Sequence, residues 1–283
     1  MTYNECEAWA QRQLAEVETA LETLVPADGP AGLGEAMRYA VLDGGKRLRP
    51  LLVLAAAEAV QGHCGAALRA AAAVELIHAY SLVHDDMPCM DDDALRRGKP
   101  TVHVRYGEAQ AVLAGDAMQA LAFEVLTPDE GVEPVLQARL VSLLARASGC
   151  AGMAGGQAID LASVGKPLDE TTLRDMHRRK TGALLQASVL MGAACGRTDA
   201  NAWTALAEFG DAIGLAFQVV DDILDVTQDS EVLGKTAGKD LDHNKPTYVS
   251  VLGLDAARAY AVALRDQAQA ALVRAGLAAP ARL

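Results

Sequence analysis

Long apolar segments alternate along the chain with short polar segments that contain glycine or proline, and this pattern predicts a chain built of helices. Asn4, with Glu7 three residues later, is expected to cap a first helix that runs to about residue 24. No linker or shift in composition interrupts the pattern, so we expect residues 1–283 to form a single domain. Further helices are expected over residues 33–42, from Pro50 onward, through the apolar run 74–83, and over 109–126, 132–150, 169–195 and 200–225, followed by two amphipathic helices.

Two glycine-containing segments interrupt the expected helices. Glycines at 152, 155 and 156 predict either a loop or a place where another backbone or a ligand comes close. Within residues 169–195 we expect a break at Lys180-Thr181-Gly182, because Gly182 can loosen the helix and free a carbonyl. Lys180 is then a cation at the edge of an apolar region, either extended into solvent or available to a phosphate.

Composition narrows the fold class. Hydrophobic residues make up 51% of the 283 residues, enough for one large core, whereas aromatic residues make up only 4%. Alanine is abundant and runs of β-branched residues are few, which favours helices that pack closely through small side chains. We therefore predict an all-α fold of about ten or more helices.

The net charge and the cysteine pattern limit the classes of binding partner and the cellular compartment that we expect. The formal net charge of −12 argues against nucleic acid and against an anionic membrane surface. The five cysteines are scattered and form no Cys-x-x-Cys pair, as expected for reduced thiols. The chain begins without a basic segment, and residues 182–196, its longest nearly uncharged run, are too short to span a membrane. We expect a soluble, cytoplasmic protein.

Two acidic clusters each follow an apolar helical run. Residues 84–93 read His-Asp-Asp-Met-Pro-Cys-Met-Asp-Asp-Asp and hold five carboxylates, and Asp221, Asp222 and Asp225 follow the apolar run 213–220. Either cluster alone could be a solvated loop in which charge repulsion is screened. Because both clusters close an apolar helix, we favour binding of divalent cations.

The spacing of these carboxylates suggests their geometry. Asp221 and Asp225 are four residues apart and lie about 40° apart around a helix, so they share one face. Pro88 disfavours helix at Met87, so the chain is expected to turn there and to bring Asp91 back toward Asp85. Ligands that are all oxygen select Mg²⁺ before Mn²⁺, and Mg²⁺ is usually completed by water and substrate phosphates.

A group of cations precedes Pro50. Lys46, Arg47 and Arg49 are expected around the first turn of a helix, where free N–H groups and the helix dipole favour an anion. A solvated basic turn is the alternative. His78 lies seven residues before Asp85, two helical turns away, and so shares the face that carries the acidic cluster.

These motifs together resemble the trans-isoprenyl diphosphate synthases, and within them the bacterial farnesyl diphosphate synthases. Asp85-Asp86-x4-Asp91 with Arg96-Arg97, and Asp221-Asp222-x2-Asp225, are similar to the two aspartate-rich motifs of that family. The resemblance covers roughly residues 35–250 and is highly specific, because further motifs occur in the family's order. They are Gly44-Gly45-Lys46-Arg47-Leu48-Arg49-Pro50, Gly155-Gly156-Gln157, Lys180-Thr181-Gly182, Phe217-Gln218 and Gly234-Lys235.

The resemblance implies the isoprenoid synthase fold, with helices around a central active-site cavity, and head-to-tail transfer of an allylic diphosphate onto isopentenyl diphosphate. Up to three Mg²⁺ ions that bridge to substrate would be held by Asp85, Asp91 and Asp221, with Asp86, Asp222 and Asp225 as ligands or as neighbours of the ligands. Arg96, Lys180, Lys235 and Lys245 would assist departure of the diphosphate. Isopentenyl diphosphate would bind at a metal-free site formed by Lys46, Arg49, His78 and Arg97.

The resemblance also implies how the allylic cation is stabilised and how product length is set. The main-chain carbonyl of Thr181 and the side chain of Gln218 would face the cation. Tyr80 and Ser81, five and four residues before Asp85, would line the floor under the growing chain. An aromatic residue at Tyr80 goes with C15 products in the family, so we expect farnesyl diphosphate, although Tyr80 could also be an ordinary core residue.

Four alternatives remain open. A geranylgeranyl diphosphate synthase differs only in product, and a class I terpene cyclase has no need for the second anion site at Lys46 and Arg49. A catalytically silent partner subunit should have lost carboxylates, and an EF-hand module would require a glycine and a terminal Glu that residues 85–93 lack. Family analogy implies a homodimer. Members of the family usually continue into another helix and a basic tail that helps close the site, so we expect either that this sequence is truncated or that this lid is reduced.

Overall fold

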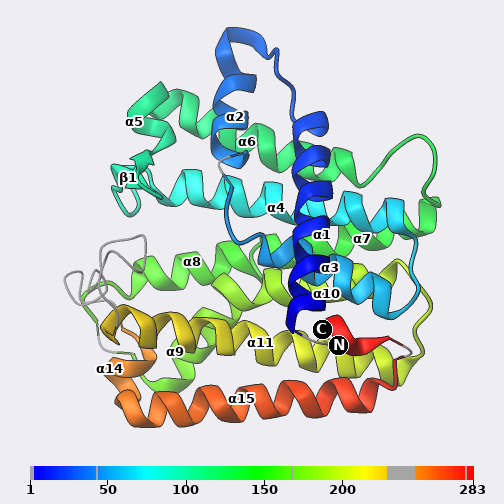
Figure 1. Cartoon of the computed structure of the whole chain (residues 1–283). Helices are drawn as coiled ribbons and strands as arrows, with labels where there is room; N and C mark the ends of the chain where they lie inside the picture. Colours follow the sequence, from blue (N-terminus) through cyan, green and yellow to red (C-terminus); the bar gives the residue numbers. More distant parts are fainter. Residues whose placement is uncertain (1–2, 43, 167, 228–245, 278) are drawn as a thin grey trace. The chain divides into compact units, whose positions relative to one another are not determined.

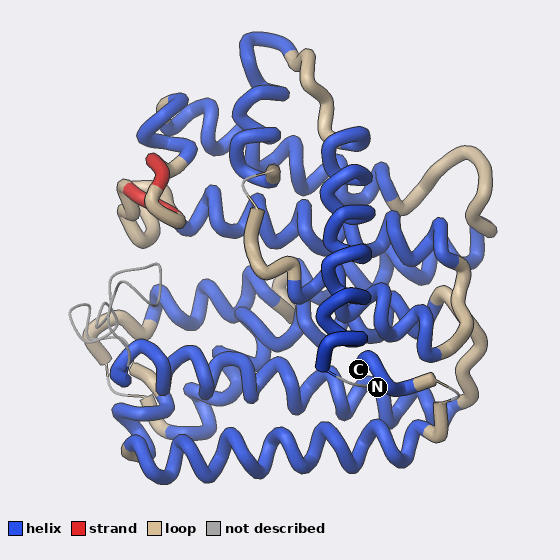
Figure 2. The backbone as a smooth tube through the Cα atoms, in the orientation of Figure 1, coloured by secondary structure: helices blue, strands red, loops and turns tan. Residues whose placement is uncertain are grey.

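The computed structural model describes residues 3–42, 44–166, 168–227, 246–277 and 279–283. The described chain is almost entirely helical, and its short strands form one two-stranded hairpin (Figures 1 and 2). The all-α prediction is therefore confirmed. Lys235 and Lys245 lie outside the described residues.

Two compact units make up the chain. The first contains Met1–Leu143, Met191–Thr198 and Ala278–Leu283, and the second contains Leu144–Leu190 and Asp199–Leu277. The expected assignment of residues 1–283 to one domain stays a prediction.

The first unit is organised around a long helix, α4 (Cys64–Asp85), which packs against α1, α2, α3 and α6; α6 lies beside it in Figure 1. Helix α4 is apolar all round, so it is buried among its neighbours. It is long and apolar enough to cross a membrane, but 72% of its apolar window is buried, as in the core helix of a globular protein. The other elements of this unit are α1 (Tyr3–Leu24), η1 (Pro30–Gly32), α2 (Leu33–Val41), α3 (Leu48–Ala59), β1 (Leu95–Arg96), β2 (Lys99–Pro100), α5 (Val102–Tyr106), α6 (Glu108–Val125), the first part of α7 (Pro134–Ser148) and η3 (Pro280–Arg282).

The second unit is organised around α11 (Ala200–Thr227), which packs along its length against α15 (Leu254–Ala275) (Figure 1). Its core includes Leu173, Leu215 and Tyr248, all buried. The remaining elements are α8 (Met153–Ala162), α9 (Glu170–His177), a π-helical turn η2 (Arg178–Gly182), α10 (Ala183–Ala194), whose last residues belong to the first unit, and α14 (Tyr248–Leu252).

Most of the predicted helices are present, and three details differ. Asn4 lies inside α1 rather than at its cap, so the predicted cap is wrong. Helix α3 begins at Leu48, so Arg49 is helical and Pro50 is its third residue, where the missing N–H costs no intrahelical bond. Gly155 and Gly156 are helical within α8 rather than part of a loop. The break predicted at residues 180–182 is the π-helical turn.

Candidate active site

The first acidic cluster begins where α4 ends. Asp85 is the last residue of the helix and Asp86 caps it. After Pro88 the chain turns back, so that the Asp91 N–H donates to the Asp85 carbonyl at 2.8 Å. The return of Asp91 predicted from Pro88 is therefore found in the backbone.

Asp86 differs from Asp85 in its surroundings. It is only 3% exposed, and its two carboxylate oxygens accept hydrogen bonds from the Arg96 guanidinium, with Nε at 3.0 and 2.9 Å and Nη2 at 2.5 Å. Burial raises the pKa of Asp86, and the Arg96 cation opposes that effect. Asp86 thus holds Arg96 in place, whereas Asp85 and Asp91 are half-buried and reach the surface.

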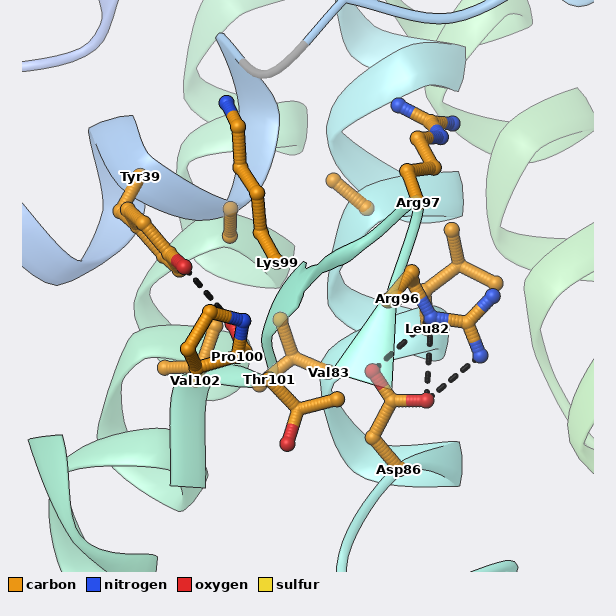
Figure 3. A pocket seen from close by; sticks show the side chains of 12 residues that line it. Tyr39, Leu82, Val83, Asp86, Arg96, Arg97, Lys99, Pro100, Thr101 and Val102 are labelled. Carbon is orange, nitrogen blue, oxygen red and sulfur yellow. Dashed lines mark hydrogen bonds and ion pairs between the residues drawn. The ribbon is translucent and has the colours of Figure 1, made fainter. Parts of the chain in front are cut away.

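A tight hairpin sends Arg96 and Arg97 in different directions. Strands β1 and β2 are joined by Arg97 and Gly98, both left-handed with φ of 53° and 77°, which is the backbone of a type I′ turn. Figure 3 shows Arg96 turned onto Asp86 while Arg97 extends away from it. Arg97 Nη1 donates to the carbonyl of Gly44, so the hairpin meets the segment that carries Lys46. A pocket beside the hairpin is lined by the apolar residues Ala79, Leu82, Val83 and Val102 and by the cations Arg96, Arg97 and Lys99. Figure 3 shows Arg97 and Lys99 extending in the same direction, away from Asp86.

The fold brings a group of cations together behind the hairpin. Burial, followed by the charges of Arg49 and Arg97, lowers the pKa of His78 well below its ordinary value, so its imidazole is neutral at pH 7. Burial also lowers the pKa of Arg49, and its Nε atom has no hydrogen-bond partner among the described residues. Lys46 is exposed beside this group. The arrangement offers positive charge and donors to an anion.

Arg47 does not belong to that anion site. It is 4% exposed, and its guanidinium binds the carboxylates of Glu18 and Glu75. The expectation that Arg47 faces an anion, and the alternative that it lies in a solvated turn, are both wrong. Sequence reasoning missed Glu75 as well, although a charged residue inside the apolar run 74–83 signals a buried ion pair.

Tyr80 lies on the side of α4 that packs against α6. It is 8% exposed, and burial raises the pKa of its hydroxyl, an effect opposed by a hydrogen bond with the Gln119 side chain. Its ring meets His84 edge to face, with 5.7 Å between centroids. Ser81 uses its hydroxyl locally, donating to the His78 carbonyl at 2.8 Å.

In the second unit, Lys180 lies in the π-helical turn and is paired with Asp160 of α8. The Lys180 Nζ is 2.6 Å from Asp160 Oδ2, and the Asp160 side chain is 10% exposed. A Cβ on Gly156 would lie 2.2 Å from the Lys180 backbone nitrogen, so a glycine is required where α8 meets the turn. Two explanations were open for Gly156, a loop or the close approach of another backbone or a ligand. The structure shows the close approach of the Lys180 backbone. Asp160 is a second residue that sequence reasoning missed; its signal is that it is the one charged residue of α8.

A chain of hydrogen bonds connects Thr181 to the second acidic cluster. The Thr181 hydroxyl donates to Gln218 Oε1 at 3.1 Å, and Gln218 Nε2 donates to Asp222 Oδ1 at 2.8 Å. Asp222, 2% exposed, also accepts the Tyr248 backbone N–H on Oδ2 at 2.8 Å. Asp222 therefore fixes which end of the Gln218 amide faces Thr181.

The remaining carboxylates of this cluster share helix α11. Asp221 is half-buried and Asp225 is 4% exposed. Nearby, His177 is buried against the Tyr248 ring, with centroids 5.4 Å apart, and burial lowers the His177 pKa to about 4, so it is neutral at pH 7. That the two acidic clusters converge on one diphosphate stays a prediction.

The donor set suits a hard divalent cation. Asp85 and Asp91 offer oxygen atoms only, and the turn of the chain at Asp91 keeps them close. Within the described ranges, no three acidic, histidine or cysteine side chains are already gathered as a metal-binding group. A site that leaves positions for water and phosphate is what Mg²⁺ uses with phosphorylated substrates.

Comparison with known proteins decides the family. The family model for polyprenyl synthetases matches residues 30–274. The chain belongs to the polyprenyl synthetase family. It is accordingly a prenyltransferase of isoprenoid biosynthesis, and the resemblance drawn from its motifs is confirmed.

Similar polyprenyl synthetases carry two kinds of product name. A probable farnesyl diphosphate synthase of Bradyrhizobium diazoefficiens is 50% identical over 93% of this chain and 81% of its own length. The large subunit 1 of a heterodimeric chloroplastic geranylgeranyl pyrophosphate synthase of Arabidopsis thaliana is 49% identical over 89% of this chain and 70% of its own. A Helicobacter pylori geranyltransferase, crystallised with magnesium and isoprenyl diphosphate, has a TM-score of 0.86 and 36% identity, covering 99% of this chain and 94% of that one.

Proposed function

We propose that this polyprenyl synthetase joins dimethylallyl and geranyl diphosphates to isopentenyl diphosphate and releases farnesyl diphosphate. The observation that carries the proposal is the separation of two kinds of anion site within one unit. Carboxylate Asp85 ends α4 and Asp91 returns to it from the following turn, while Arg49 and Arg97 form a cationic group together with the neutral imidazole of His78. One diphosphate must leave and the other must stay, so two chemically different sites are what the reaction requires.

In the proposed mechanism, Asp85, Asp91 and Asp221, together with Asp225, would hold Mg²⁺, which would supply charge neutralisation for the departing diphosphate. Arg96, held by Asp86, and Lys180, held by Asp160, donate hydrogen bonds to the same group. Lys235 and Lys245 would add positive charge. Lys46, Arg49, His78 and Arg97 retain isopentenyl diphosphate through charge-assisted hydrogen bonds, without a metal ion.

The allylic cation is stabilised by oxygen atoms of the second unit. We propose the Thr181 main-chain carbonyl, in the π-helical turn, and the Gln218 side chain for this role. Asp222 supports it by accepting the Gln218 amide N–H, which leaves the amide oxygen on the side of Thr181. No side-chain base is assigned; the released diphosphate would take the proton.

The test of this proposal is product analysis. Purified protein is incubated with Mg²⁺, isopentenyl diphosphate and each allylic primer in turn, and the products are separated by chain length. We expect C15 diphosphate from both dimethylallyl and geranyl primers and little elongation of farnesyl diphosphate. C20 product instead supports the alternative, geranylgeranyl diphosphate synthase, which the plant relatives favour. A protein that makes no prenyl product contradicts both.

Product length is expected to depend on Tyr80. Tyr80→Ala removes the ring that we propose as the floor of the elongation cavity, so the major product should shift from C15 to C20 or longer. Tyr39→Ala, which removes an aromatic ring on α2 bonded to the Pro100 carbonyl, is the matched control and should leave C15 unchanged. Product chromatography measures both variants; a Tyr80→Ala enzyme that still stops at C15 removes Tyr80 from this role.

We further propose that the enzyme is a cytoplasmic homodimer. Val104 on α5 and Leu113 on α6 are each more than half exposed in the described structure, at 52% and 53%. Apolar residues at neighbouring elements are typical of a surface that a second subunit covers. Light scattering measures the mass in solution, and a monomer at catalytic concentrations contradicts the proposal.

A further inference from the structure

The Arg47 guanidinium makes four hydrogen bonds within the protein. Its Nε donates to Glu18 Oε1 at 2.6 Å, and its Nη2 donates to Glu18 Oε2 at 3.1 Å and to the Val41 carbonyl at 2.6 Å. Its Nη1 donates to Glu75 Oε1 at 2.6 Å. Arg47 and Glu75 are 4% and 3% exposed. A side chain that is buried and spends four of its five N–H donors on these partners holds the protein together and is not presented to a substrate.

The partners of Arg47 come from different parts of the first unit. Glu18 lies on α1, Val41 ends α2 and Glu75 lies on α4. Arg47 itself precedes α3 with a left-handed backbone, φ 43° and ψ 35°. A non-glycine residue adopts that conformation at a cost, and it persists where the surroundings fix the side chain. The three helices therefore determine the path of the segment between residues 44 and 49.

Unlike Arg47, the cations Lys46 and Arg49 keep donors that are available to a ligand. Lys46 is exposed, and the buried Arg49 Nε has no hydrogen-bond partner among the described residues. His78 follows Glu75 by three residues on α4, so the helix that holds Arg47 also carries the histidine of the cationic group. Glu75 is also close enough for its charge to act on Arg49.

We infer that the cluster of Arg47, Glu18 and Glu75 is a positioning device that sets Lys46 and Arg49 against His78 for capture of the isopentenyl diphosphate phosphates. This inference rests on the proposed function. Arg47 is a positioning residue, since it acts through its neighbours. Its loss should affect isopentenyl diphosphate more than the allylic substrate, which we assign to other residues.

Arg47→Lys tests the inference because lysine keeps the charge but cannot make the forked contacts to two carboxylates. We expect the KM for isopentenyl diphosphate to rise about 10- to 100-fold, as small misplacements at binding residues do. The KM for geranyl diphosphate and kcat should change less than about threefold. Arg38→Lys is the matched control: Arg38 binds the Glu22 and Val25 carbonyls without touching residues 44–49, and its KM values should match wild type.

A second variant guards against simple loss of folding. Arg47→Met combined with Glu75→Met replaces a buried ion pair by apolar side chains of similar length, which proteins commonly tolerate. We expect normal melting and a raised KM for isopentenyl diphosphate. If either folded Arg47 variant binds isopentenyl diphosphate as wild type does, the positioning role is overturned.

Binding of isopentenyl diphosphate without Mg²⁺, measured by calorimetry, separates this inference from the proposed function. A wild-type protein that makes no prenyl product contradicts the proposed function. The positioning role is then judged by binding alone: weaker binding by Arg47→Lys supports it, and equal binding overturns it.

Discussion

Asp85→Asn should lower kcat/KM for prenyl transfer by about 10³-fold while leaving the protein about as stable as wild type. The loss follows from the proposed role of Asp85 in holding Mg²⁺ on the leaving diphosphate. Two effects on stability oppose each other. Asp85 is the last residue of α4, where the negative end of the helix dipole repels a carboxylate, and relief of that repulsion contributes about 0.3–1 kcal/mol to the free energy of unfolding. The variant also loses the attraction between the Asp85 carboxylate and the Arg96 guanidinium.

Asp92→Asn is the matched control for Asp85→Asn. Asp92 lies in the same loop, is exposed and has a φ of 51°, a conformation that asparagine tolerates. Both variants remove one negative charge from the same cluster, so the change in the net charge of the loop is the same in both. Asp92→Asn should keep kcat/KM within about threefold of wild type. Steady-state kinetics and thermal melting decide; equal losses in the two variants would refute a specific role for Asp85.

Asp222→Asn should lower kcat by about 10²- to 10³-fold with little change in melting temperature. The substituted amide can keep the Tyr248 N–H on its oxygen, but its NH₂ group then faces Gln218. Gln218 can restore its hydrogen bonds by turning its own amide over, with Thr181 accepting. The network stays satisfied, but an N–H group replaces the oxygen proposed to face the allylic cation.

Asp222→Ala shows the effect of removing the hydrogen bonds of Asp222, whereas Asp222→Asn changes only the orientation of the Gln218 amide. The alanine variant removes the acceptor of the buried Tyr248 N–H and of the partly buried Gln218 amide, so the free energy of unfolding should fall by about 2–4 kcal/mol. Asp211→Asn, on the same helix but paired with the exposed Arg178, is the control and should keep activity within about twofold. Denaturant unfolding and single-turnover kinetics measure these variants. An Asp222→Asn enzyme with wild-type kcat contradicts the orienting role.

Local sequence determined the elements and the chemistry of this protein. Helical segments, the break at residues 180–182 and the turn after Pro88 were predictable because each depends on residues within a few positions of one another. The donor type of the proposed metal site followed for the same reason: Asp85 and Asp91, or Asp221 and Asp225, are separated by less than two helical turns.

Only the tertiary structure decided which of several neighbouring charged side chains are paired with other residues of the protein. Arg47 and Arg49 are two residues apart and look equivalent in the sequence, yet Arg47 is bound by Glu18 and Glu75 from distant positions. Asp86 and Asp222 likewise differ from the aspartates beside them because Arg96 and the Tyr248 N–H reach them. A buried charge must find a partner wherever the fold supplies one, and that partner's position is not encoded near the charge itself.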